Sequence, residues 1–143
     1  MRTFKDLKDR DWELSVTLGL ALRVKGKLGV DLLQPEEGNG LGRLVADDAL
    51  LAQVIVEAIE PQMEGRGLNA ADVAESFDGA VLCAAQAAFM EEYADFFRSR
   101  GRSDRALAVE KMRESLGLAS EAARSRIETL DLKGRIDGAM SGD

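Results

Sequence analysis

The sequence contains no histidine and a single cysteine, Cys83. Without histidine the chain cannot form a Ser-His-Asp or Cys-His catalytic set, an HExxH zinc site or a two-Cys, two-His zinc finger. One cysteine allows neither an internal disulfide nor a metal site built from several cysteines. We therefore expect an enzyme activity to be absent, with no catalytic residues, no metal and no cofactor. Because the chain cannot form an internal disulfide, its folding does not need an oxidising compartment, and we expect the protein in the cytoplasm.

The chain also lacks a long apolar run and an excess of positive charge. No apolar stretch approaches the roughly 18 residues that span a bilayer, and residues 1–6 are too polar for a signal peptide, so we expect no membrane association. The net charge is −7, of which −6 (3 basic and 9 acidic side chains) falls in residues 51–100. That charge disfavours nucleic acid as a partner. The acidic middle is either a solvated helix face or a surface for a basic or amphipathic partner.

An alternating pattern near the N-terminus predicts a β-hairpin. Trp12, Leu14 and Val16 alternate with polar residues, which places the three apolar side chains on one face of a strand. Residues 3–5 supply an antiparallel partner through a polar turn over residues 6–10. A two-stranded hairpin is marginal alone, so we expect helices to cover its apolar face and Trp12 to belong to the core.

Helical patterns account for most of the remaining chain. They predict helices over residues 18–28, 48–60, 70–77, 80–97 and 103–130, with Thr17, Asp47, Asn69 and Ser103 as N-caps. Gly29 is expected as a left-handed C-cap, and Pro61 is expected to end or kink its helix. Residues 34–42, with Pro35 and three glycines, are predicted to be a loop.

These elements predict a mainly helical α+β domain, in which an N-terminal β-hairpin packs on a bundle of about five or six helices. Residues 1–133 are predicted to form this single domain and residues 134–143 a flexible tail. Within the alanine-rich helix, Cys83 is expected to be a small buried apolar residue. Residues 98–102 form a basic connection interrupted by glycine.

Neither glycines nor acidic pairs supply a site. The glycines at 38, 40 and 42 lack the GxGxxG spacing and a preceding strand, which disfavours nucleotide binding. Paired acids such as Glu91 and Glu92 point about 100° apart on a helix, so they do not converge on one site. We expect them to be solvated surface residues. We therefore find no catalytic set in the sequence.

Two stretches resemble a family of small phage and prophage proteins. The first is FKDLKDRDWELSVTLGLALRVKGKLGVDLL, in which an aromatic residue, an acidic turn and a W-x-L-x-V strand precede a helix that ends in GVDLL. The second is EAIEPQMEGRGLNAADVAESFDGAVLCAAQAAFMEEYADFF, a helix, a turn, a short capped helix and a long alanine-rich helix. Together they span roughly residues 3–100. The pattern is similar to that of the tail assembly chaperones of long-tailed phages.

This resemblance implies a non-enzymatic role in the bacterial host cytoplasm. Such chaperones coat the long helical tape measure protein, keep it soluble and help to recruit tail-tube protein subunits. Apolar grooves between helices would receive the partner, and acidic surface would keep the complex dispersed. We expect the partner to contact apolar residues exposed near the end of the alanine-rich helix and along the last helix: Tyr93, Phe96, Phe97, Met112 and Leu116.

One alternative is another phage structural component, a head–tail connector or a tail-completion protein that forms an oligomeric ring. The long seam after Ser103 also leaves homo-oligomer formation open. A small enzyme is disfavoured by the missing histidines, and a nucleic-acid-binding protein by the charge.

Overall fold

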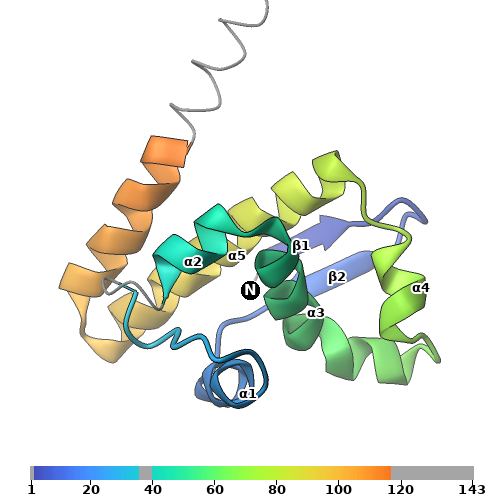
Figure 1. The fold of residues 1–143 in the computed structure, drawn as a ribbon, viewed down its shortest axis with the longest axis horizontal. Helices are drawn as coiled ribbons and strands as arrows, with labels where there is room; N and C mark the ends of the chain where they lie inside the picture. The colour runs from blue at the N-terminus through green and yellow to red at the C-terminus, as the bar shows by residue number, and fades with distance from the viewer. Residues whose placement is uncertain (1, 36–39, 117–143) are drawn as a thin grey trace, which may run out of the picture. The chain divides into compact units, whose positions relative to one another are not determined.

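The computed structural model describes residues 2–35 and 40–116. In these residues the chain forms a two-stranded β-hairpin and six helices, so the prediction of a mainly helical α+β fold is confirmed (Figure 1). The named elements are β1 (Arg2–Lys5), β2 (Asp11–Leu14), α1 (Leu18–Leu28), α2 (Leu41–Ala46), α3 (Asp48–Gly65), α4 (Ala70–Ala74) and α5 (Gly79–Arg100). A further helix covers residues 103–116.

The hairpin has the predicted antiparallel pairing and, apart from Val16, the predicted buried face. Its strands are antiparallel, with Phe4 opposite Trp12. Phe4, Trp12 and Leu14 are buried, whereas Val16 lies beyond the strand and is only half-buried. Strand β1 packs against α5, and β2 packs mainly against α3. The two longest helices therefore supply the cover that a two-stranded sheet needs.

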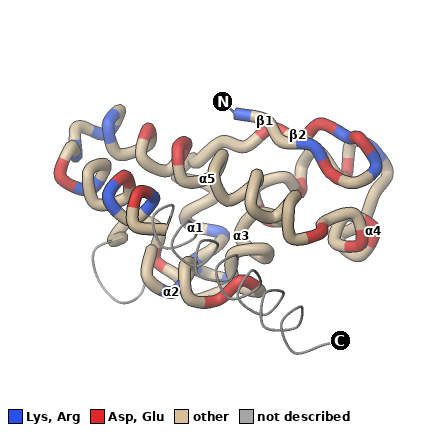
Figure 2. Tube along the Cα trace, turned by 90° about the horizontal axis from the view of Figure 1, so that it is seen from above, with Lys and Arg blue, Asp and Glu red and all other residues tan. Residues whose placement is uncertain are grey.

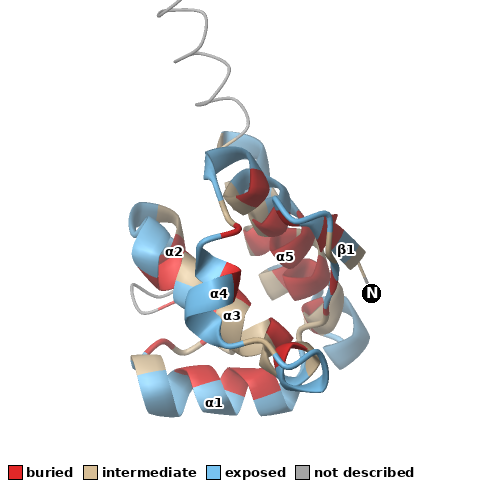
Figure 3. Ribbon diagram, turned by 90° about the vertical axis from the view of Figure 1, so that its right-hand side faces the viewer, coloured by how far each residue is buried: buried red, intermediate tan, exposed pale blue. Residues whose placement is uncertain are grey.

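The core lies between α3, α5 and the hairpin, and α1 packs on α3 from outside. The largest fully buried side chains include Trp12 from the hairpin, Ile55 and Ile59 from α3, and Phe89 and Tyr93 from α5. Helix α1 has a buried stripe on one side and an exposed opposite face (Figure 3). Its apolar spacing thus positions one side of α1 against the domain.

Most helix ends are set by the residues that the sequence indicates. Thr17 and Asp47 accept hydrogen bonds from the third backbone N–H beyond them, at the starts of α1 and α3. Asn69 and Asp72 form a reciprocal capping box at the start of α4. Gly29 ends α1 with a φ of 69°, a conformation that glycine adopts without the steric cost of a Cβ atom. These local predictions are confirmed, but the N-cap predicted at Ser103 is not: Ser103 is the first helical residue, and the N–H of Ala106 donates to the backbone oxygen of Arg102.

The predicted loop over residues 34–42 is too long at its C-terminal end, because α2 begins at Leu41. Leu41 and Leu44 are buried, so tertiary packing gives this short helix its stability. At Gly40 a Cβ atom would lie 2.6 Å from the backbone oxygen of Gln34. Glycine is needed here for close backbone approach, a role that the sequence pattern did not separate from loop flexibility.

Pro61 does not end its helix, which is a second correction. Helix α3 continues through Pro61 to Gly65. Pro61 itself is exposed, whereas Ile59 and Met63 on either side are buried. The apolar contacts of these neighbours offset the loss of one backbone hydrogen bond.

Two side chains of α5 have a different environment from the predicted one. Cys83 is exposed, so its alanine neighbours do not place it in the core. Glu92, which the sequence predicts to be solvated, is buried. The small residues of α5 are spread around the helix, and their positions alone do not identify its inner face.

The end of the predicted last helix, over residues 117–130, and the tail over residues 134–143 lie outside the described residues. Contacts within the chain group residues 1–110 into one compact unit and residues 111–143 into another. The single domain over residues 1–133 stays a prediction. Among the described residues, no helix has the length and apolar character needed to cross a bilayer.

Candidate functional site

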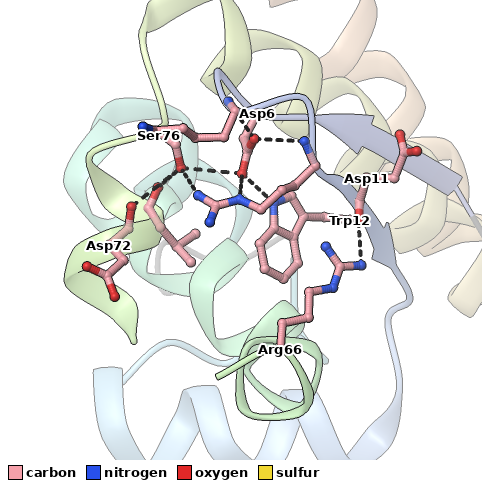
Figure 4. A network of polar contacts seen from close by, with 9 residues as sticks. Asp6, Asp11, Trp12, Arg66, Asp72 and Ser76 are labelled. Atoms are coloured by element: carbon pink, nitrogen blue, oxygen red, sulfur yellow. Dashed lines mark hydrogen bonds and ion pairs between the residues drawn. The ribbon is translucent and has the colours of Figure 1, made fainter. Parts of the chain in front are cut away.

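A buried polar cluster surrounds Asp6 in the hairpin turn (Figure 4). The Asp6 side chain has no solvent exposure. One carboxylate oxygen accepts the backbone N–H groups of Lys8 and Arg10 at 2.8 and 3.0 Å. The other accepts Arg10 Nε at 2.7 Å, Trp12 Nε1 at 2.9 Å and the Ser76 hydroxyl at 3.3 Å. Each oxygen is thus occupied by donors of the chain itself.

Burial raises the pKa of Asp6, but the hydrogen bonds from Trp12, Arg10 and Lys8 outweigh it and lower the pKa to about 2. Asp6 is therefore a permanent anion near neutral pH. Because Ser76 follows α4, the bond ties the hairpin turn to that helix. A carboxylate whose two oxygens both accept hydrogen bonds from the chain itself indicates a structural role.

Arg66 completes this region on the other side of Trp12. Its guanidinium lies 4.3 Å from the Trp12 ring centroid and donates a 2.6 Å hydrogen bond to the backbone oxygen of Asp11 (Figure 4). The cation covers the indole face and joins the end of α3 to β2. This contact is also structural.

An apolar pocket at the end of α5 is the stronger candidate. Its volume is about 430 Å³, within the range of roughly 300–1,000 Å³ typical of binding pockets. Four segments line the pocket: helix α1, the segment after α1, the end of α5 and the residues that follow α5. The lining residues are Leu18, Leu33, Phe96, Phe97, Arg100, Arg102 and Arg105.

The pocket opens beside an exposed apolar strip on α1. Leu18 is 55% exposed and Leu22 is 58% exposed. Residues four apart share one face of a helix, so the strip extends from the pocket along α1. Phe96 is half-buried and packs edge-to-face on Phe97, with ring centroids 5.4 Å apart.

The arginines give the pocket a positive rim. Arg102 forms a two-pronged ion pair with Asp104, with N–O distances of 3.0 and 2.9 Å. Arg105 donates to the backbone oxygen of Leu33 at 2.7 Å. Arg100 is exposed and makes neither an ion pair nor a hydrogen bond with any described residue. Figure 2 shows basic residues in blue along this part of the chain, within an acidic protein.

Of the three expected contact residues on α5, two line this pocket. Phe96 and Phe97 line it, although Phe97 is almost fully buried. Tyr93 does not have the expected exposure: it is fully buried, and its hydroxyl donates to the backbone oxygen of Leu32. Met112 and Leu116 are half-exposed in the helix over residues 103–116.

Sequence reasoning missed the pocket residues that lie far from Phe96 in the chain. Leu18 is the first residue of a predicted helix and Leu33 ends the GVDLL phrase, and no signal in the sequence joins either residue to α5. The basic connection over residues 98–102 was visible, but its position beside an apolar pocket depends on the tertiary fold.

Among the described residues, no group of three histidine, cysteine, aspartate or glutamate side chains is arranged to hold a metal. Compared with protein-family models, with curated proteins and with solved structures, the chain matches none. Its function must therefore be inferred from its own residues.

Proposed function

We propose that this protein is a non-enzymatic phage tail assembly chaperone that binds helical segments of the tape measure protein and helps to recruit tail-tube subunits. The observation that carries the proposal is the open apolar pocket bordered by Leu18, Leu33 and Phe96. This pocket supports a binding site, and the resemblance over roughly residues 3–100 supports the identity of the partners.

The pocket suits a helical partner because its apolar floor continues into an exposed strip. Amphipathic helices bind such grooves through apolar side chains at intervals of three, four and seven residues. Leu18 and Leu22 would flank the partner while Phe96 contacts the inserted side chain. Exposed leucines at this spacing favour binding of a partner, because the partner would remove their apolar surface from water.

The remaining surface suits a solubilising role. The net charge of −7 would keep chaperone-coated chains apart through mutual repulsion. Several acidic side chains lie on α3, where Glu57 and Glu60 form ion pairs with Lys27. A carrier of a long apolar protein needs both properties, an apolar site and a dispersing surface.

The test is co-expression with the tape measure protein of the same phage or prophage. Leu18→Asp places a charge at the pocket, and Leu7→Asp makes the same change at a leucine of nearly equal exposure, 57% against 55%, in the hairpin turn. Wild type and Leu7→Asp should keep the tape measure protein soluble and co-purify with it, whereas Leu18→Asp should not. The proposal is wrong if the wild-type chain neither binds nor solubilises the partner.

A ring-forming connector or tail-completion protein is the second candidate, favoured by exposed leucines that copies of the chain could cover. Besides Leu18 and Leu22, Leu107 is 49% exposed. Light scattering distinguishes the two functions: a fixed large oligomer at all concentrations, and the protein's presence in purified virions, would support the ring.

A further inference from the structure

We infer that the pocket selects an acidic amphipathic helix, one whose apolar anchor is flanked by carboxylates that bind the arginine rim. This inference rests on the proposed function and adds the chemistry of the partner segment to it. The observation behind it is that, among the described residues that line the pocket, three of seven are arginines and none is acidic.

The local charge opposes the charge of the whole protein. Residues 98–105 contain four arginines and one aspartate, whereas the chain carries −7. Arg98 is engaged by Asp95 and Glu110 and does not line the pocket. The other three arginines do. A positive rim on an acidic protein attracts carboxylates to one place and repels them elsewhere, which orients the partner.

Two of the rim arginines are already positioned. Arg102 is held by Asp104, and Arg105 by the backbone oxygen of Leu33. A held side chain loses less conformational entropy when it binds a carboxylate. Arg100 has no partner in the described chain and is the arginine most available to a ligand.

The apolar floor favours a protein helix over nucleic acid. A phosphate backbone would contact the arginines and leave Leu18 and Phe96 uncovered. The acidic residues of the middle third would also repel a polyanion over a distance of about 10 Å at 0.1 M salt. An acidic amphipathic helix covers the floor and neutralises the rim with few charges.

The probe is a pair of fluorescein-labelled helical peptides of equal length. Both carry leucine and phenylalanine four residues apart as the apolar anchor. One has glutamate on either side of the anchor, and the other has glutamine in the same places. Fluorescence anisotropy measures binding to the full chain. We expect the glutamate peptide to bind about ten-fold more tightly in low salt, with the difference reduced several-fold at about 0.5 M salt.

Arg100→Gln and Lys8→Gln form a matched pair of variants. Both remove one positive charge from an exposed position, but Lys8 lies in the hairpin turn and does not line the pocket. Arg100→Gln should weaken binding of the glutamate peptide about three- to five-fold and leave the glutamine peptide unchanged. Lys8→Gln should change neither by more than about 1.5-fold.

The outcomes separate the inference from the proposed function. Equal binding of both peptides, lost in Leu18→Asp, would overturn the acidic preference and leave the helix-binding pocket intact. Failure of both peptides to bind would contradict the pocket as a helix site and therefore both proposals. If a short DNA duplex displaces the glutamate peptide and its own binding requires Arg100, the arginines serve phosphate and the inference is wrong.

Discussion

Replacing Asp6 by asparagine tests the cluster that joins the hairpin to α4. The carboxylate accepts five hydrogen bonds, and the Trp12 indole that donates one of them is fully buried. An asparagine oxygen in the place of Oδ2 would retain Arg10 Nε and Trp12 Nε1. Its NH₂ group would then face the backbone N–H groups of Lys8 and Arg10, so donors would oppose donors.

The expected loss follows from the pKa of Asp6. Its hydrogen bonds, acting against burial, lower the pKa from 3.8 to about 2. By linkage, this contributes about 2 kcal/mol to the free energy of unfolding at neutral pH. Because the folded-state pKa is the lower one, the contribution is present above about pH 3.8 and disappears as the pH falls to about 2. The opposed donors bring the expected cost of Asp6→Asn to about 2–3 kcal/mol.

Trp12 provides the assay, since it is the single tryptophan of the chain and is buried. Urea unfolding followed by its fluorescence at pH 7 should give a midpoint about 1 M lower for Asp6→Asn. The control is Asp9→Asn in the same turn, because the Asp9 side chain is 89% exposed; its midpoint should not change. An unchanged midpoint for Asp6→Asn would refute this reasoning. So would an Asp6→Asn variant that loses as much stability as wild type when the pH falls from about 3.8 to about 2.

Three further changes test other parts of the fold. Tyr93→Phe leaves the buried backbone oxygen of Leu32 without its hydroxyl donor and should lower the free energy of unfolding by about 1–2 kcal/mol in urea; no change would show that another donor replaces it. Gly29→Ala, at a φ of +69°, should cost about 1 kcal/mol, whereas Gly26→Ala inside α1, where nothing lies within 4 Å of the added Cβ, should stabilise by about 0.5–1 kcal/mol; equal effects would contradict the left-handed cap. Cys83 is exposed and should react with one equivalent of a thiol reagent without denaturant, and a thiol that reacts only after unfolding would mean that it is buried.

Features that depend on neighbouring residues were predictable from the sequence. The alternation around Trp12 gave the buried face of the hairpin, and Asn69 with Asp72 gave a capping box. In such features the hydrogen-bond partners lie within a few residues of one another. The mainly helical α+β class followed from the same periodicities.

Features that depend on packing were not predictable. The continuation of α3 through Pro61 depends on the buried residues around it, and the exposure of Cys83 depends on which side of α5 faces the core. The pocket joins Leu18 to Phe96, residues that are far apart in sequence. Hydrophobic periodicity identifies an apolar face, but it does not identify what covers that face.

The most direct test of the account is site-specific photo-crosslinking to the tape measure protein. A photoreactive phenylalanine analogue replaces Leu22, on the exposed strip beside the pocket, or Leu7, which has nearly the same exposure at 57% against 58% but lies in the hairpin turn. We predict a crosslink to the tape measure protein from position 22 and none from position 7. Equal crosslinking from both positions, or crosslinking from position 7 alone, would contradict a partner site at the α1–α5 pocket.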